Sequence, residues 1–463
     1  MRTYLILLTI YLYFSIAFAV LYLKRNVNRK LEDQNLGDIG ESLLLTLLIE
    51  LGKIEEAQQA AEVKFEEFHD VKSYSGFLTV NKNFHSNLFF WFFPAKVNYE
   101  KAPVVVWLQG GPGGSSMFGL FMENGPFNLT ADGTLELSKY SWAEKHSMIY
   151  IDNPVGTGFS FTDAHGHAQN ETAVGNAVYQ GLLQFFTLFP ELQNNEFFLS
   201  GESYAGKYVP AVAYTIHRNN PVNNLKINLK GLAIGNGLCD PKHQNVYADY
   251  LYQIGLIDFN IQASMKHLQK KIVRHLDHKH WLAAYNTYVD LINLFREVSG
   301  FENLYNFLEP KDVLRESETL LTSYLQRKDV KKAIHVGNIN FTAQSDMVYN
   351  NLKIDFMQSV TPLISELLEH YRVLIYNGQL DIIVAYPLTE NFLLHFQFNR
   401  ADEYKKAPRH YWQVDDDIAG YAKYAGNLTE VLVRNAGHMV PSEQPKWALD
   451  LITRFIANKP LYQ

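Results

Sequence analysis

Short apolar segments, each closed by a Gly- or Pro-rich turn, recur along most of the chain. VVVWLQ (104–109) and FFLSG (197–201) have the length that is typical of buried strands, and they are rich in branched or aromatic residues, as such strands are. Four more segments have the same form: SMIYIDNP (147–154), GLAIGNG (231–237), VLIYNG (373–378) and EVLVRNAG (430–437). Helical stretches lie between several of them, and this alternation predicts a mostly parallel sheet covered by helices. In such sheets the functional site lies beyond the carboxyl ends of the strands.

Two regions depart from this alternation. From residue 74 the chain has two strand-like segments, SGFLTVN and NLFFWFFPA, and the polar KNFHS between them predicts a β-hairpin. Between residues 240 and 346 the spacing becomes helical, with apolar residues at steps of four and three: Trp281, Tyr285, Tyr288, Ile292 and Phe295. The absence of flexible linkers in the sequence favours an inserted cap over an independent domain. We therefore expect an α/β core at 73–239 and 347–463, with a helical cap at 240–346.

The first 19 residues are apolar and carry a single charge, at Arg2. They end in Ala17-Phe18-Ala19, which matches the cleavage pattern of a secretory signal peptide. The alternative is a membrane anchor, because the apolar run continues for a few residues before the basic residues that begin at Lys24. Those charges would lie on the lumenal side of an outward-facing anchor, which the positive-inside rule disfavours. We expect cleavage at residue 19 and no stable membrane anchor.

Residues 20–72 form the most polar and irregular part of the chain, with one helical stretch expected near residues 42–63. This segment fits an N-terminal arm or a propeptide. We expect a protein of the secretory pathway, either secreted or lysosomal, and such a protein can carry glycans on Asn-x-Thr triplets. Four triplets are present, beginning at Asn128, Asn170, Asn340 and Asn427.

Composition excludes several classes of protein. Hydrophobic residues make up 47% of the chain and charged residues 19%, which is too apolar for a disordered protein. The 41 basic and 48 acidic residues give a net charge of −7 without a long basic run, so nucleic acid is not an expected partner. The single cysteine, Cys239, excludes an intramolecular disulfide and a Cys-rich zinc site.

The strongest chemical signal is GESYAG (201–206), directly after the apolar run FFLS. A serine on a tight strand-to-helix turn projects its hydroxyl above the sheet, and small residues are needed two positions before and after it, where backbones crowd. Gly201 and Ala205 occupy those positions around Ser203. The strict pattern has glycine at the second position, so the motif by itself also fits a structural Gly-Ser turn.

A serine nucleophile needs a base, and the base needs a third group that fixes its tautomer. In hydrolases built on this turn the chain order is Ser, Asp, His, and Asp381 and His438 follow strand-like runs in that order. A rival cluster, His275, His278 and His280, has a spacing that could bind a metal ion, but no strand-end carboxylate accompanies it, which favours a solvated helix face. We therefore expect a Ser–His–Asp site without a metal or other cofactor.

Seven motifs resemble, in order, those of the serine carboxypeptidase family, most closely its vitellogenic-like branch. They are VVVWLQGGPGGSS (104–116), ENGP (123–126), DNPVGTGFS (152–160), GESYAGKYVP (201–210), IGNG (234–237), NGQLD (377–381) and AGHMVP (436–441). The resemblance implies an α/β-hydrolase fold with a helical insertion. It also implies an enzyme that removes single residues from peptides and proteins with a free C-terminus, generally at acidic pH. Monomer and homodimer both stay open.

The resemblance also assigns roles to residues. It implies Ser203 as nucleophile, His438 as acid and base, and Asp381 as the group that orients the imidazole. The family's oxyanion hole maps to the backbone N–H groups of Gly111 and Tyr204. Two alternatives use the same fold: an acyltransferase or esterase, in which an alcohol accepts the acyl group, and a non-catalytic binding or protective protein, which an intact triad disfavours.

The family grips the free carboxylate of its substrate with an Asn side chain, the following glycine N–H and two acids, which map to Gln109, Gly110, Glu123 and Glu202. An acid holds a carboxylate only when the two share a proton, so such a grip favours low pH. The glutamine at 109 is one methylene longer than the family's Asn, so its contact is open. Gly114 replaces the family's usual cysteine, which leaves Cys239 without a partner and the cap without disulfides.

Overall fold

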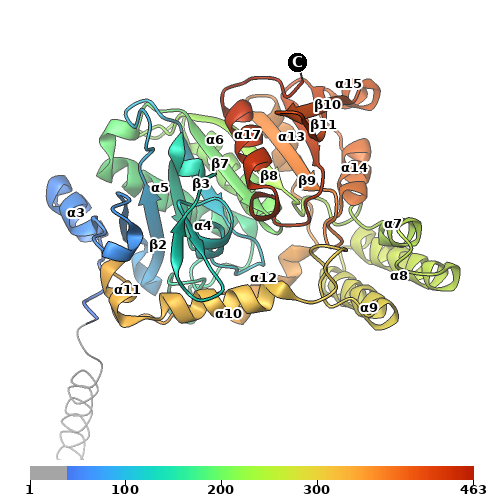
Figure 1. Ribbon diagram of the computed structural model, residues 1–463, viewed down its shortest axis with the longest axis horizontal. Coiled ribbons are helices and arrows are strands. Elements are labelled where there is room, and N and C mark those ends of the chain that lie inside the picture. The colour runs from blue at the N-terminus through green and yellow to red at the C-terminus, as the bar shows by residue number, and fades with distance from the viewer. Residues whose placement is uncertain (1–38, 463) are drawn as a thin grey trace, which may run out of the picture.

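The structure, a computed structural model, describes residues 39–462. The predicted signal peptide (1–19) and the first part of the expected arm (20–38) lie outside the described residues. Ten strands form one large sheet with helices on both faces (Figure 1). The six central strands pair in parallel, and the strands at both edges pair antiparallel. This arrangement confirms the predicted mostly parallel sheet flanked by helices.

In spatial order, the strands of the large sheet are β1 (Tyr74–Asn81), β2 (Ser86–Phe93), β6 (Ser147–Ile151), β3 (Val104–Leu108), β7 (Phe197–Glu202), β8 (Leu229–Gly235), β9 (Arg372–Gly378), β12 (Leu428–Val433), β11 (Asp417–Ala425) and β10 (His410–Val414). The hairpin of β1 and β2 is the one that the sequence predicts. The hairpin of β10 and β11 at the opposite edge is not predicted by the pattern. A separate small sheet pairs β4 (Phe127–Leu129) with β5 (Leu135–Leu137).

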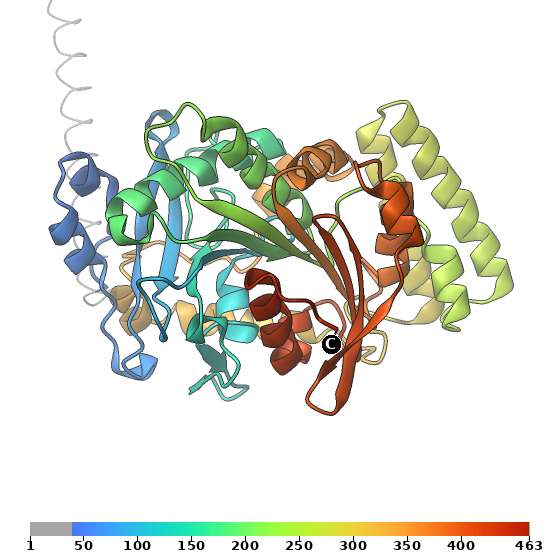
Figure 2. The same ribbon diagram turned by 90° about the horizontal axis from the view of Figure 1, so that it is seen from above.

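Strand β3 shows why the central strands are mostly apolar. Val104 and Val106 pack into one core, which includes residues of α5 (Glu171–Leu188) and α6 (Ala205–Asn219). Val105 and Trp107 point the other way, into a second core shared with α4 (Met117–Met122) and α17 (Pro445–Ile456). Figure 2 shows these helices on opposite sides of the sheet. Because alternate residues of a strand face opposite sides, a sheet covered on both faces needs apolar residues at every position.

The remaining helices lie in the N-terminal arm, between β8 and β9, and after β9. They are α2 (Thr46–Glu50), α3 (Ile54–Ala61), α7 (Tyr247–Gln253), α8 (Phe259–Asp277), α9 (Trp281–Ser299), α10 (Val313–Leu325), α11 (Lys328–Ala333), α12 (Asp346–Phe356), α13 (Thr361–Leu368), α14 (Tyr386–His395), α15 (Ala401–Lys406) and α16 (Val440–Glu443). Short 3₁₀ turns occur at Glu66–Phe68, Lys82–Phe84, Trp142–Glu144 and Pro190–Leu192. Among the described residues, no helix is both long enough and apolar enough to span a membrane.

Helices α7 to α11 occupy the segment for which the sequence predicts a cap. In α9 the expected stripe is present, with Tyr285, Ile292 and Phe295 buried. Helices α7, α8 and α9 lie together beside the carboxyl ends of the central strands, whereas α10 and α11 run back along the core (Figure 1). Leu321 and Leu325 of α10 are buried in the same core as α4. The domain boundaries at residues 240 and 346 stay a prediction.

The N-terminal arm contains two short helices where the sequence predicts one stretch at 42–63. Helix α2 ends at Glu50, and Gly52 takes a left-handed backbone with φ of +70°. Glycine adopts this conformation without a steric penalty, and it reverses the helical course of the chain. Helix α3 starts two residues later, at Ile54.

Candidate active site

Ser203 lies on the sharp turn between β7 and α6, directly above the middle of the sheet. Its φ of +62° is in the left-handed region, which is strained for a residue with a side chain. Backbone hydrogen bonds hold the turn on both sides: Ser203 N–H donates to the carbonyl of Gly235 at 2.9 Å, and its own carbonyl accepts from Gly206 at 3.0 Å and Leu238 at 2.9 Å. This is the turn that presents a nucleophile above an α/β sheet.

The sharp turn at Ser203 is sterically possible because the residues packed against it are glycines. A Cβ added to Gly201 would lie 2.4 Å from the carbonyl oxygen of Leu108. A Cβ added to Gly110 would lie 2.6 Å from Tyr204 N and 2.7 Å from Ser203 Cβ. The loop at 110–114 therefore approaches the turn to a distance that only glycine permits.

We expect Gly110→Ala to lower both stability and activity. The new methyl group would meet backbone rather than the end of a flexible side chain, so the loop must move away from Ser203. Overpacking of this kind typically costs about 1 to 3 kcal/mol. Thermal unfolding gives the first effect and kcat the second. A variant with an unchanged unfolding temperature and kcat would show that the loop can shift freely.

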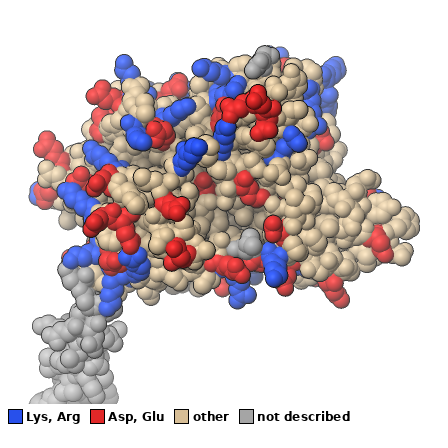
Figure 3. Space-filling view, in the orientation of Figure 1, with Lys and Arg blue, Asp and Glu red and all other residues tan. Residues whose placement is uncertain are grey.

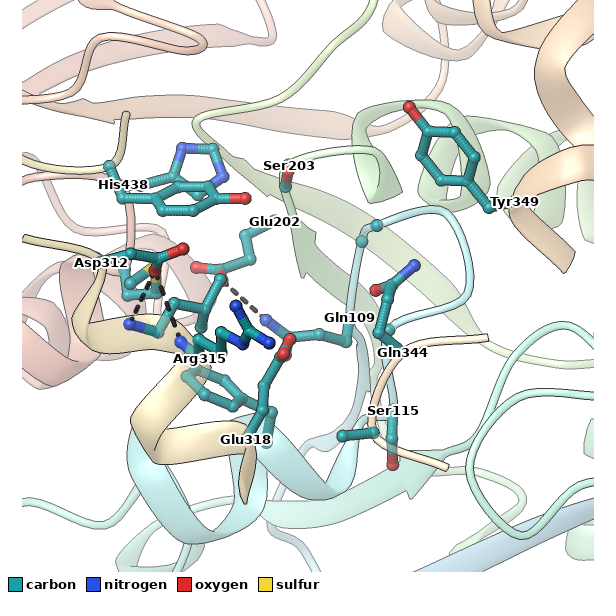
Figure 4. A pocket seen from close by; sticks show the side chains of 18 of the residues that line it. Gln109, Ser115, Glu202, Ser203, Asp312, Arg315, Glu318, Gln344, Tyr349 and His438 are labelled. Atoms are coloured by element: carbon teal, nitrogen blue, oxygen red, sulfur yellow. Dashed lines mark hydrogen bonds between the residues drawn. The ribbon is translucent and has the colours of Figure 1, made fainter. Parts of the chain in front are cut away.

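Asp381 and His438 follow β9 and β12 and are brought together at the same edge of the sheet. His438 Nδ1 lies 2.8 Å from Asp381 Oδ2, and both side chains are buried. The other imidazole nitrogen, Nε2, is buried without a hydrogen-bond partner among residues 39–462. Ser203 and His438 line the same cavity (Figure 4), although the described contacts include no hydrogen bond between Ser203 Oγ and His438.

Asn236 is a site residue that the sequence reasoning missed. Its amide Nδ2 donates to Asp381 Oδ2 at 2.8 Å, and its Oδ1 accepts from the N–H of Gly378 at 3.1 Å. The amides of Ile383 and Val384 add two more donors, at 3.0 and 3.2 Å. Together these donors fix the orientation of the Asp381 carboxyl group toward His438. The signal was available, because Asn236 is the asparagine of IGNG.

The two amides predicted for the oxyanion hole come from opposite sides of Ser203. Gly111 lies on the glycine loop with φ of +110°, and Tyr204 directly follows Ser203. Neither N–H donates to an acceptor within the described part of the chain. The loop is closed by a hydrogen bond from Gly114 N–H to the carbonyl of Gly110 at 2.9 Å. The arrangement leaves two backbone donors available beside the hydroxyl.

Gln109, Glu123 and Glu202 form a polar cluster at the cavity, with both carboxyl groups buried and with Gln109 and Glu202 in the cavity lining. Gln109 Nε2 donates to Glu202 Oε1 at 2.7 Å and to Glu123 Oε1 at 3.1 Å. Gln109 Oε1 accepts from Trp107 Nε1 at 2.8 Å, which fixes the orientation of the amide. The longer side chain of Gln109 thus reaches both carboxyl groups. Gly110, the fourth residue predicted for this grip, lines the same cavity.

The two carboxyl groups cannot both be ionised near neutral pH. Burial raises the pKa of Glu123 to about 7, and hydrogen bonds from Glu202 and Gln109 act against this rise. Burial also raises the pKa of Glu202 well above its usual range, and the neighbouring Glu123 adds to the effect. Like charges at this distance favour one shared proton. The pair therefore holds at least one proton at acidic pH.

The cavity lined by Ser203 and His438 has a volume of about 490 Å³, and charged side chains also line it (Figure 4). Asp312, Arg315 and Glu318 extend from the start of α10 toward Gln109 and Glu202. A second cavity of about 340 Å³ also reaches Ser203. Its lining is rich in tyrosine, with Tyr204, Tyr247, Tyr285, Tyr288, Tyr305 and Tyr349. The hydroxyl of Ser203 thus stands where a polar cavity and an aromatic cavity meet.

The remaining sequence candidates lie away from these cavities. His275, His278 and His280 lie at the end of α8 and the start of α9, with ring centroids 6.2 Å and 5.8 Å from that of His280. No group of three or more His, Cys, Asp or Glu within residues 39–462 is arranged to hold a metal ion. Basic and acidic side chains are interspersed on the face shown in Figure 3.

The four predicted glycosylation sites are all exposed: Asn128, Asn170, Asn340 and Asn427. Asn170 caps α5 through its Oδ1, which accepts from Ala173 N–H at 2.9 Å. The amide of Asn427 donates to the carbonyl of Leu368 at 2.8 Å. Their glycosylation stays a prediction. Cys239 is a buried free thiol.

The fold belongs to the α/β-hydrolase class. The structure is similar to that of Kex1Δp, a prohormone-processing carboxypeptidase from Saccharomyces cerevisiae, with a TM-score of 0.78 at 24% sequence identity. The match covers 87% of this chain and 96% of the yeast protein. The predicted fold class is therefore confirmed.

Sequence comparison gives the family. Residues 63–458 match the serine carboxypeptidase family of peptidases, and the chain belongs to this family of hydrolases. The chain is 54% identical to the venom serine carboxypeptidase of Apis mellifera, over 91% of this chain and 92% of the relative. It is 48% identical to the vitellogenic carboxypeptidase of Aedes aegypti, over 90% of each. It is 46% identical to the human probable serine carboxypeptidase CPVL, over 94% of each. These matches confirm the resemblance seen in the motifs.

Proposed function

We propose that this protein hydrolyses the C-terminal residue from peptides and proteins at acidic pH, through a Ser203–His438–Asp381 triad and an acyl-enzyme intermediate. The observation that carries the proposal is the buried carboxyl pair of Glu123 and Glu202, which Gln109 bridges. Gln109 and Glu202 line the cavity that Ser203 borders, and Glu123 lies behind them. A general esterase has no need of a proton-sharing site there. A free C-terminal carboxylate does need one.

The chemistry follows from the geometry of the strand ends. His438 Nε2 accepts the proton of Ser203 Oγ, which attacks the scissile carbonyl carbon. The amides of Gly111 and Tyr204 stabilise the oxyanion, and each such donor is typically worth about 3 to 4 kcal/mol. His438 then donates its proton to the departing amine, which leaves as the C-terminal amino acid. Water, deprotonated by His438, releases the acyl group and restores the serine.

Asp381 supports this cycle without changing its own protonation. It accepts from His438 Nδ1, which leaves Nε2 as the proton acceptor and stabilises the imidazolium that forms. The donors from Asn236, Ile383 and Val384 hold its carboxylate in place. The buried pair at 123 and 202 supplies the dependence on acidic pH, because it can donate to a substrate carboxylate only while it holds a proton.

The N-terminal sequence and the four triplets support a secretory route. We propose that the mature chain starts at Val20, carries glycans on the exposed asparagines, and is secreted or directed to lysosomes. N-terminal sequencing of the secreted product and a mobility shift on deglycosylation test this part. Recovery of Met1 in a membrane-bound product would favour the anchor.

The carboxylate grip makes a sharp prediction for Glu202→Gln. The substitution keeps the shape of the side chain and supplies a donor at every pH. For the wild type we expect KM for a free-acid peptide to rise as pH increases through the pKa of Glu123 near 7, because the shared proton is lost. In the variant, hydrolysis of the free acid should extend toward neutral pH, and the preference for a free acid over its C-terminal amide should fall.

A matched control is Glu171→Gln. Glu171 is also buried, burial raises its pKa to about 8, and it lines neither cavity at Ser203. Each enzyme is measured with a matched pair of substrates, free acid and amide, from pH 4 to 8. The control should keep the acid-to-amide ratio of the wild type. An unchanged ratio in Glu202→Gln as well would remove Glu202 from the binding site, and equal rates on acid and amide in the wild type would contradict the proposed exopeptidase.

A further inference from the structure

A segment between α9 and α10 contacts both loops that complete the triad. We name residues 303–308 the clasp. The N–H groups of Ile382 and Ile383 donate to the carbonyl of Leu304, at 3.1 and 3.0 Å. The two residues after Asp381 are therefore bound to the clasp rather than to their own strand.

The clasp also binds the loop that carries His438. The N–H of His438 donates to the carbonyl of Tyr305 at 2.7 Å, and the two rings lie 5.0 Å apart. Asn306 adds a side-chain contact, because its Nδ2 donates to Glu443 Oε2 at 2.5 Å. The same oxygen accepts from the N–H of Gly437 at 2.9 Å. Glu443 thus links the clasp to the residue that precedes the catalytic histidine.

The fit between these segments is tight. A Cβ on Gly437 would lie 2.3 Å from the carbonyl oxygen of Tyr305 and 2.7 Å from Glu443 Oε1. Asn306 itself lines neither of the cavities at Ser203. A change at Asn306 can therefore reach the chemistry through the position of His438, and it leaves the substrate-binding surface intact.

We propose that Asn306 is a positioning residue for His438, acting through Glu443 and the backbone of Gly437. The inference rests on the proposed function and deepens it: the helical insertion supplies part of the support that aligns the general base. An imidazole displaced by about 1 Å can lose about a hundredfold in rate, because proton transfer requires close alignment. The expected signature is a lower kcat with an unchanged KM.

In the variant Asn306→Asp, we expect the loss of kcat to depend on pH. The new carboxyl group faces Glu443, whose other charged neighbours are Asp381, His438 and Glu123. Burial raises the pKa of Glu443, so at low pH the two acids can share a proton and keep the contact. As pH rises both lose their protons and repel. The contact is therefore present at acidic pH and lost toward neutral pH.

The experiment measures the ratio of variant to wild-type kcat on one peptide from pH 5 to 7.5, which cancels the pH dependence of the wild type. We expect a ratio within about twofold of one at pH 5 and a fall of about tenfold or more by pH 7.5. Adding Glu443→Gln to Asn306→Asp should remove most of this dependence on pH, because only one of the two side chains can then be charged. The ratio should stay below one, since an amide nitrogen that donates to the new carboxylate cannot also accept from the N–H of Gly437. For Asn306→Asp alone, a ratio that stays flat with pH would overturn the proposal.

Two further variants separate positioning from folding. Asn399→Asp is the matched control, since Asn399 Nδ2 donates to Glu369 Oε2 at 3.0 Å on an exposed surface away from the site; it should give a flat ratio. Asn306→Ala removes the donor to Glu443 and also the acceptor of the Leu308 N–H, at 3.0 Å. It should lower kcat severalfold at every pH, with KM and product binding unchanged. A wild-type kcat in Asn306→Ala would overturn the proposal. Loss of the proposed function itself would appear differently, as a wild-type enzyme without carboxypeptidase activity.

Discussion

Ser203→Ala should abolish peptide hydrolysis and leave the folded protein intact. The hydroxyl is needed only for the covalent step, and alanine fits wherever serine fits at this turn. Loss of a triad nucleophile typically lowers kcat by about a millionfold, with a residual rate over water from the oxyanion hole. The measurement compares kcat and the unfolding temperature of the variant with those of the wild type. Activity near that of the wild type would contradict the proposed mechanism.

The same experiment has an internal check. His438→Ala should cost about as much as Ser203→Ala, because the serine cannot be deprotonated without its base. The double variant should be scarcely slower than either single variant, since residues that act as one unit lose their effect together. Additive losses would mean that the two side chains contribute independently, which the proposed triad forbids.

Asp381→Asn should lower kcat by about ten-thousandfold with little change in shape. In the wild type, His438 Nδ1 donates to the Asp381 carboxylate. In the variant, the asparagine amide would present a donor to Nδ1 instead. The imidazole would then carry its proton on Nε2, where it cannot accept the proton of Ser203. KM should change little, because Asp381 is buried and lines neither cavity.

The matched comparison for this variant is Asn236→Ala. That change removes one donor to Asp381 Oδ2 and leaves the carboxylate in place, so the loss of kcat should be far smaller. Equal losses in the two variants would mean that the charge of Asp381 matters less than the integrity of the loop around it.

The central sheet and the proposed triad could be predicted from the sequence because both predictions depend on local patterns. The parallel strands are largely buried on both faces, so each contains a short apolar run, and the residues soon after it lie at the functional edge of the sheet. Ser203, Asp381 and His438 occupy such positions. Their order along the chain then indicated that they meet.

What the sequence did not predict depends on neighbours distant along the chain. Strand β10 has only 5 residues, with Trp412 and Val414 buried and Tyr411 exposed. An alternation this short does not distinguish a strand from a loop. The roles of Asn236 and Asn306 arise from a contact made across the fold, with Asp381 and Glu443 respectively. Asn236 lies in the IGNG motif, but the motif does not show which residue it contacts, and nothing local distinguishes Asn306 from other loop asparagines.

The order of strands in the sheet also has a consequence for biosynthesis. Strands β7, β8, β9 and β12 lie side by side, yet about half the chain separates Ser203 from His438. A ribosome delivers the nucleophile early and the base only when almost the whole polypeptide has been made. Until β12 takes its place between β9 and β11, the nascent chain has a serine without a proton acceptor. Under the proposed mechanism, the chain therefore acquires its activity only when synthesis is nearly complete.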